Sequence, residues 1–224
     1  MKFSIAALSL ATIAAATPVE PRQSCPKVYV FGARETTAPA GYGTAGGLVN
    51  SIKSAYPGAG SEAINYPACG GQSSCGGASY DSSASQGTQA VVKAVTAYNQ
   101  KCPSTQIVLV GYSQGGQIMD NALCGGSGAT LTGNALAAVK AAIFMGDPHN
   151  RAGLPYNVGT CAAQGFAARP QGFQCSPANT SIIKSYCDSA DPYCCNGNDA
   201  NAHQQYVNKY GSQALAFIKT KVTA

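Results

Sequence analysis

The segment from Gln106 to Leu123 constrains the fold more than any other part of the chain. Gln106–Val110 is the strongest predicted strand, because its apolar run is typical of a strand buried on both faces of a parallel sheet. It leads directly into Gly111-Tyr112-Ser113-Gln114-Gly115, and a helical pattern follows. Such a sharp strand–turn–helix junction presents the serine hydroxyl above the sheet, at the amino end of the helix. The motif alone could be an ordinary turn, but in this setting it predicts that Ser113 is a nucleophile.

Four other short runs predict strands: residues 27–31, 63–66, 141–145 and 182–186. Apolar residues at helical spacing from Ala90 to Tyr98 predict a helix between the second and third strands. Residues 114–123 and 202–221 predict two more helices. The alternation of strands and helices predicts an α/β fold, with a parallel sheet of five strands covered by helices on both faces.

A serine nucleophile needs a general base, and the chain contains two histidines, His149 and His203. In α/β-hydrolases the order along the chain is serine, acid and then a late histidine, which favours His203. His149 directly follows a predicted strand and is interpreted as an exposed histidine in a loop.

Four aspartates follow the serine and could supply the acid that orients the histidine: Asp147, Asp188, Asp191 and Asp199. Asp191 lies after the fifth predicted strand, between Cys187 and Cys194, and a disulfide there would hold its loop rigid. Asp147 also follows a strand and remains the alternative. Asp188 and Asp199 are interpreted as solvated loop carboxylates.

The developing oxyanion needs two donors, and the first is the backbone N–H of Gln114. The second should come from the loop after the first strand, where Thr36 offers both an N–H and a hydroxyl. Glu35 could be read as a second acid, but an ion pair with Arg34 or another surface charge is the simpler interpretation.

The N-terminal sequence has the pattern of a secretory signal peptide: one early lysine, a short apolar run and small residues at its end. With a short pro-segment it would occupy residues 1–22, leaving one catalytic domain at 23–224 without a carbohydrate-binding module. No apolar stretch is long enough to predict a membrane span. The net charge is +5, but the basic residues are scattered singly, which does not favour nucleic-acid binding.

Ten cysteines follow the predicted signal peptide: Cys25, Cys69, Cys75, Cys102, Cys124, Cys161, Cys175, Cys187, Cys194 and Cys195. An even number of cysteines in an exported chain favours up to five disulfides over metal ligands. A zinc site is the alternative, but neither histidine has metal-ligand spacing with the cysteines. We therefore expect no metal and no other cofactor.

Several long stretches resemble the fungal acetylxylan esterases of the cutinase-like carbohydrate esterase family: residues 30–37, 65–77, 107–116, 146–148 and 185–197. This resemblance extends from about Cys25 to the end of the chain. It implies an α/β-hydrolase fold with five parallel strands and no lid. It also implies the triad Ser113, Asp191 and His203 and an oxyanion hole of Thr36 and Gln114, and so it selects Asp191 over Asp147.

The resemblance implies further features of the site and its frame. Tyr193 resembles a tyrosine that narrows the acyl pocket, although packing over the loop disulfide is an equally good interpretation of this ring. The implied disulfides are Cys25–Cys102, Cys69–Cys75, Cys124–Cys175, Cys161–Cys195 and Cys187–Cys194.

Together these features predict a secreted, extracellular, monomeric serine esterase that removes acetyl groups from acetylated xylan. Two alternatives remain: a cutinase or short-chain lipase, and a non-catalytic secreted protein that binds glycans or a host. Asn179-Thr180-Ser181 is a glycosylation sequon.

Overall fold

A computed structural model of the protein describes residues 24–223, and the predicted signal peptide and pro-segment at 1–22 lie outside the described residues. The strands form one parallel sheet in the order β2-β1-β3-β4-β6-β5. Their bounds are Val28–Ala33 (β1), Gly60–Ala63 (β2), Gln106–Tyr112 (β3), Val139–Met145 (β4), Asn157–Val158 (β5) and Ile183–Tyr186 (β6).

The sheet therefore has six strands, and the prediction of five was wrong. The additional strand, β5, is two residues long and pairs Asn157 with Ser185 and Val158 with Tyr186 on β6. Such a short edge strand has no apolar run by which a sequence pattern could reveal it. The second predicted strand, 63–66, was also displaced, because β2 ends at Ala63.

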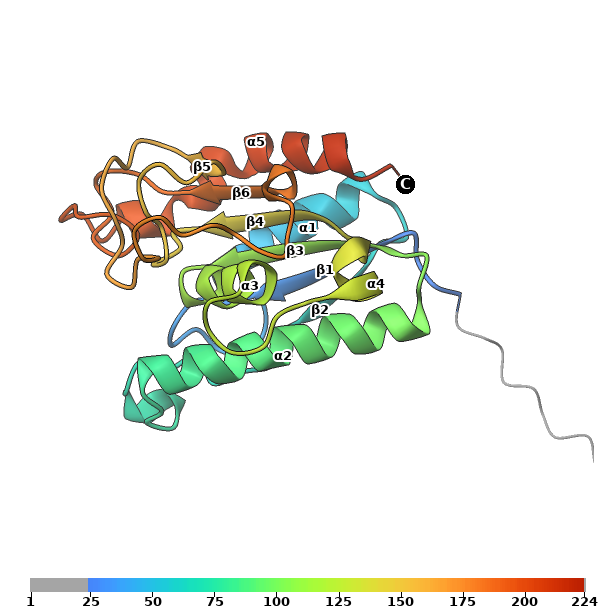
Figure 1. Ribbon diagram of the computed structural model, residues 1–224, viewed down its shortest axis with the longest axis horizontal. Helices are drawn as coiled ribbons and strands as arrows, with labels where there is room; N and C mark the ends of the chain where they lie inside the picture. Colours follow the sequence, from blue (N-terminus) through green and yellow to red (C-terminus); the bar gives the residue numbers. More distant parts are fainter. Residues whose placement is uncertain (1–23, 224) are drawn as a thin grey trace, which may run out of the picture.

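Helices cover both faces of the sheet, as Figure 1 shows. Helices α1 (Gly46–Ala55) and α5 (Tyr206–Lys221) pack on one face, and α2 (Tyr80–Lys101), α3 (Gln114–Cys124) and α4 (Gly133–Ala138) pack on the other. Short 3₁₀ turns complete the regular structure: η1 (Gly43–Ala45), η2 (Ser73–Cys75), η3 (Thr180–Ile182) and η4 (Ala202–Gln204). The predicted last helix began too early, because residues 202–204 form η4 and the α-helix starts at Tyr206.

Two apolar layers hold the sheet between these helices. Val91 of α2 and Ile118 of α3 pack with Phe31 and Leu109 on one face. On the other face, alternate residues of the same strands, such as Val30 and Val108, pack with α1 and α5. Strands β1 and β3 are therefore buried on both sides, which explains their largely apolar sequences.

The cysteines form five disulfides, in the pairs that the family resemblance implied: Cys25–Cys102, Cys69–Cys75, Cys124–Cys175, Cys161–Cys195 and Cys187–Cys194. The sulfurs of Cys161, Cys187 and Cys195 lie within 4.8 Å of one another, but each belongs to a disulfide. This explains the cluster without a zinc ion.

Within residues 24–223, no helix is both long and apolar enough to cross a membrane. Asn179 is exposed at the start of η3, where its side-chain oxygen accepts a hydrogen bond from the N–H of Ser181 at 2.9 Å.

Candidate active site

The turn between β3 and α3 has the geometry that the sequence motif predicts. Ser113 adopts φ +53° and ψ −121°, a conformation that costs energy for a residue with a side chain and is typical of functional sites. Its N–H donates to the carbonyl of Met145 on β4 at 2.8 Å, which fixes the turn against the sheet. A Cβ at Gly111 would overlap the carbonyl of Gly115, and one at Gly115 would overlap the carbonyl of Ala33. The close approach of the backbones therefore requires both glycines.

Gln114 begins α3, and its side chain is completely buried away from the solvent. Its Oε1 accepts a hydrogen bond from the Ser83 hydroxyl at 2.9 Å, and its Nε2 donates to the carbonyl of Cys69 at 3.0 Å. The side chain thus ties the helix to the Cys69–Cys75 loop. Its backbone N–H belongs to the first turn of α3, where amides have no intrahelical acceptor and the helix dipole favours negative charge.

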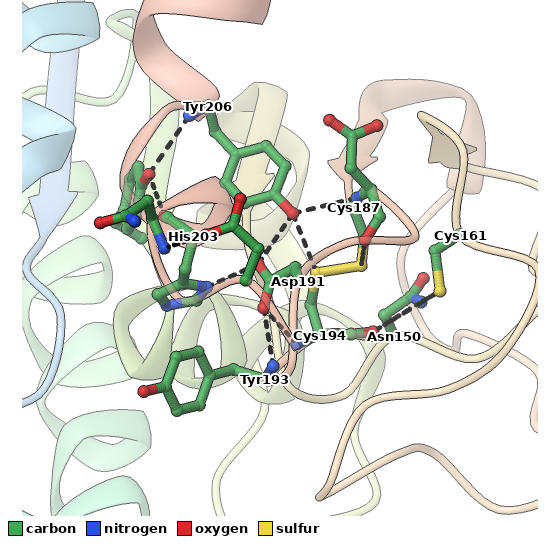
Figure 2. A network of polar contacts seen from close by, with 12 residues as sticks. Asn150, Cys161, Cys187, Asp191, Tyr193, Cys194, His203 and Tyr206 are labelled. Carbon is green, nitrogen blue, oxygen red and sulfur yellow. Dashed lines mark hydrogen bonds and ion pairs between the residues drawn. A yellow bond between two sulfur atoms is a disulfide. The ribbon is translucent and has the colours of Figure 1, made fainter. Parts of the chain in front are cut away.

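The two remaining predicted triad residues are in direct contact. Nδ1 of His203 lies 2.6 Å from Oδ2 of Asp191, and both side chains are buried (Figure 2). His203 lies on η4, just before α5, and its backbone carbonyl accepts a hydrogen bond from the hydroxyl of Tyr112 at 2.5 Å. Tyr112 immediately precedes Ser113, so the strand that carries the serine also positions the histidine.

Asp191 is fully buried, and its carboxylate accepts four hydrogen bonds. Oδ1 accepts from the backbone N–H groups of Tyr193 (2.6 Å) and Cys194 (3.2 Å), while Oδ2 accepts from His203 and from the hydroxyl of Tyr206 at 2.8 Å (Figure 2). Burial alone would raise the pKa of Asp191, but the bond and charge of His203, with the other donors, bring it below its usual value. Asp191 is therefore held as a carboxylate beside the imidazole.

Ser113, His203 and Thr36 line one cavity of about 460 Å³ together with Tyr193. The other lining residues are Glu35, Thr37, Gly70, Gln72, Tyr80, Phe166 and Gln204. The Tyr193 ring lies beside the His203 ring (Figure 2), 4.6 Å away centre to centre, and lines this cavity. A larger cavity of about 580 Å³, near Tyr29 and Tyr98, has no histidine in its lining and lies elsewhere.

His149 and Asp147, the alternative base and acid, do not line the cavity of Ser113. His149 was expected to be exposed, but it is largely buried: Nδ1 is 2.5 Å from the carbonyl of Ala167 and Nε2 is 2.9 Å from Oδ1 of Asn121. Burial and the nearby Arg169 lower the pKa of His149. Asp147 is also buried, and its Oδ1 accepts from the N–H of His149 at 2.8 Å. Burial and the charge of Asp120 raise the pKa of Asp147 well above its usual value.

The predictions for Asp188, as a solvated loop carboxylate, and for Glu35, as a surface charge paired with Arg34 or another residue, do not match the structure. Asp188 is buried and accepts from Lys209 Nζ (2.6 Å) and the Tyr210 hydroxyl (2.7 Å), because α5 packs over its loop. Glu35 accepts from the N–H and hydroxyl of Thr44 instead of pairing with Arg34. Asp199 is exposed, in agreement with its interpretation as a solvated loop residue.

Sequence reasoning missed the parts played by Tyr112 and Tyr206. Their only signal was their place on apolar faces of a strand and a helix, which indicates burial. The hydroxyl of Tyr206 also accepts from the N–H of Asp188 at 3.0 Å and lies 3.2 Å from the sulfur of Cys194. These long-range contacts, partly drawn in Figure 2, connect α5 to both ends of the acid loop.

A serine at a strand–helix turn, a late histidine and a buried aspartate on one parallel sheet define the class of α/β serine hydrolases. A family model described as Cutinase matches residues 24–222, and the chain belongs to the cutinase family.

Several relatives are known. The chain is 60% identical to Acetylxylan esterase 2 of Talaromyces purpureogenus, over 99% of this chain and 98% of that protein. It is also 60% identical to Cutinase 11 of Verticillium dahliae, over 100% of this chain and 78% of the relative. A solved acetylxylan esterase structure, 62% identical, has a TM-score of 0.86 and covers 89% of this chain and 100% of the other. The prediction of a serine carboxylic-ester hydrolase similar to fungal acetylxylan esterases is confirmed.

Proposed function

We propose that the protein removes acetyl groups from acetylated xylan through a covalent acyl-enzyme formed on Ser113. Sequence identity alone does not choose the substrate, because relatives named acetylxylan esterase and cutinase are equally similar to this chain. The choice must therefore come from the cavity beside the serine.

The lining of that cavity carries the proposal. It consists of hydroxyl, amide, carboxylate and aromatic side chains with one glycine, and it includes no aliphatic side chain. A long acyl chain gains about 0.8 kcal/mol for each methylene group that it buries against apolar surface. The lining offers an acyl chain aromatic rings only, whereas its amides and hydroxyls can form hydrogen bonds with a polar acetylated sugar.

Tyr193 supports a small acyl group. Its ring stands against His203 at 4.6 Å, and 42% of its surface is exposed. In this position, a bulky ring next to the general base limits the length of acyl chain that can extend beyond the carbonyl. The other interpretation, packing over the loop disulfide, has less support, since the ring lines the cavity.

The reaction follows from the roles that we assign to the side chains. His203 removes the proton of Ser113 as its oxygen attacks the acetyl carbonyl, and Asp191 orients the imidazole and stabilises its charged form. The backbone N–H of Gln114 and a donor from Thr36 stabilise the oxyanion, and losing one such donor costs about 2.7–4 kcal/mol of transition-state stabilisation. His203 then protonates the departing xylan hydroxyl, and water releases acetate by the same steps.

The test is acetate release from acetylated xylan, combined with a series of esters from acetyl to octanoyl. We expect efficient acetate release, and turnover that falls steeply beyond short acyl chains. Tyr193→Ala should shift the preference towards longer chains. Ser113→Ala should abolish activity, and serine-directed phosphonates should label only the native protein. Strong octanoyl hydrolysis without acetate release would identify a cutinase or lipase, and absence of labelling would favour a binding protein.

We also propose that the protein is secreted and acts as a monomer without a lid, and that Asn179 carries a glycan. Five disulfides support secretion, because they persist in oxidising compartments. Exposure of Asn179 supports modification of its sequon. Mass spectrometry of the protein recovered from the culture medium, before and after glycosidase treatment, tests secretion and the glycan on Asn179.

A further inference from the structure

The side chain of Phe166 is 60% exposed, yet the residue makes specific contacts on two sides. In the described part of the chain, Phe166 and Tyr193 are the two large apolar side chains most exposed to solvent, and both line the cavity of Ser113. Exposed aromatic surface gains nothing for folding, and when it gathers at a cleft it marks a binding surface.

Contacts on two sides fix the position of Phe166. Its backbone N–H donates to the carbonyl of Tyr193 at 3.1 Å, which joins its loop to the loop of the catalytic acid. Its ring meets the ring of Tyr80 at 5.2 Å and 69°, an edge-to-face arrangement. The Tyr80 hydroxyl in turn donates to Oε1 of Gln117 on α3 at 2.7 Å. These contacts position the exposed ring beside Ser113: the acid loop bonds its backbone directly, and α3 acts on the ring through Tyr80.

We propose that Phe166 is the stacking platform of a sugar subsite, which binds the pyranose ring that carries the scissile acetyl group or the ring next to it. This inference rests on the proposed function. An acetyl group has only two carbons, so the sugar must lie at the mouth of the same cavity when the carbonyl reaches Ser113. A pyranose presents C–H groups on its faces and hydroxyls around its rim. An aromatic ring suits the faces, and the side chains of Thr37, Gln72 and Gln204 in the same lining suit the hydroxyls.

The other possible partner of an exposed phenylalanine is an acyl chain. A path for an acyl chain would continue beyond Phe166 with aliphatic side chains, but the lining has none: it adds only the rings of Tyr80, Tyr193 and His203, one glycine, and polar side chains. Aromatic rings next to amides and hydroxyls, without aliphatic side chains, match a sugar better than an acyl chain.

The test measures kcat/KM of each variant on two substrates. One is an acetylated xylo-oligosaccharide, and the other is ethyl acetate, which has no ring that could stack. In Phe166→Leu, the ratio of kcat/KM for the oligosaccharide to that for ethyl acetate should fall about tenfold, mainly through KM, because the stacking surface is lost. Phe166→Tyr keeps the ring and should preserve the ratio. Phe217→Leu, an aromatic substitution on α5, is the matched control and should also preserve it.

Other results overturn the proposal. An unchanged ratio in Phe166→Leu would do so. If the ratio is unchanged because both esters lose activity equally, the effect of the substitution is a general structural one. A loss confined to butyryl and hexanoyl esters would assign the ring to an acyl path instead.

A binding measurement separates this inference from the proposed function. Xylohexaose is titrated calorimetrically into Ser113→Ala and into Ser113→Ala combined with Phe166→Leu. Weaker binding by the double variant, about tenfold, supports the platform, and equal binding or none in both variants overturns it. If the native protein hydrolyses ethyl acetate but not the acetylated oligosaccharides, the proposed function is wrong, and the titration alone decides on the platform.

Discussion

The hydroxyl of Tyr206 lies 2.8 Å from Oδ2 of Asp191, the same oxygen that accepts the bond from His203 at 2.6 Å. A helix on one face of the sheet thus supplies a donor to the carboxylate that orients the predicted general base. The same hydroxyl accepts from the N–H of Asp188, so it also fixes the start of the acid loop.

Tyr206→Phe tests this relationship. Without the hydroxyl, Asp191 loses one of its donors, and we expect kcat/KM to fall about tenfold, or ~1.4 kcal/mol of transition-state stabilisation. The free energy of unfolding should decrease by about 1.5–3 kcal/mol, because the lost bond is to a charged group. Enzyme kinetics and urea unfolding measure both. Tyr210→Phe is the control: it loses a similar bond, to Asp188, and should keep its activity.

Gly146 provides the second prediction, since it lies directly behind the imidazole of His203. It has φ +64°, and a Cβ there would come 2.7 Å from Cε1 of His203. Gly146→Ala should therefore displace the ring from Asp191 and lower kcat more than about 100-fold, the scale expected for a misplaced catalytic group. Gly153→Ala is the matched control, because it has φ +88° but open space around the position. Both variants should lose about 1 kcal/mol of stability from backbone strain, and only the first should lose activity. Equal activity of the two would contradict the prediction.

The third prediction concerns the identity of the acid, which residue spacing left open between Asp191 and Asp147. Asp191→Asn should lower kcat by about 10⁴, the scale measured for the corresponding aspartate in a serine protease. Asp147→Asn should retain activity, because its carboxyl bonds the N–H of His149 rather than His203. Its raised pKa predicts the sign of its effect on stability. The ionised form is disfavoured in the folded protein, so stability is lost as pH rises from about 4 through the folded pKa. The asparagine variant should avoid that loss, and unfolding curves across this range would detect it.

The contrast between Ser113 and its supporting residues explains what a sequence can predict here. Strand β3, the turn and α3 are contiguous, so the local pattern contains the whole junction, including the two glycines that the backbone requires. The late histidine follows from chain order. These features are either local or fixed by the order of elements.

Features that depend on distant segments were not predictable in the same way. Strand β5 exists only because residues 157–158 meet β6, and Asp188 is buried only because α5 packs over its loop. His149 is enclosed by Asn121 of α3 and by the carbonyl of Ala167, which lie 28 and 18 residues away along the chain. An apolar periodicity shows that a tyrosine is buried, but it cannot show which group its hydroxyl meets.

Two disulfides should differ in what they contribute most: one to stability and the other to activity. Cys187 and Cys194 are separated by 7 positions in the sequence, and their disulfide closes the loop that contains Asp191. Cys25 and Cys102 are separated by 77 positions. Chain entropy predicts that removing the long-range bond costs about 4–5 kcal/mol and the short one about 2–3 kcal/mol. Replacing Cys187 and Cys194 by serine should nevertheless reduce kcat more, because the loop that holds the acid is released. Thermal unfolding and kinetics on the same samples compare the two. A larger loss of activity in the Cys25 and Cys102 double variant would contradict this assignment.

Asp188 leads to a prediction about acid stability. Burial opposes its ionised form, but the bonds from Lys209, Tyr210 and Thr160 outweigh this and bring its pKa below the usual value. A lowered folded pKa means that the group stabilises the protein above the unfolded pKa of about 3.9 and that this contribution is lost as pH falls through the folded pKa. Asp188→Asn should therefore be less stable than the native protein by about 1–3 kcal/mol near neutral pH, through weakened bonds to a charged acceptor, and the difference should shrink below about pH 4. Urea unfolding from pH 7 to pH 2 measures the difference directly. Asp199→Asn, at an exposed position, should change the stability little at neutral pH. A difference for Asp188→Asn that stays constant over the whole range would show that its carboxylate does not stabilise the fold through its charge.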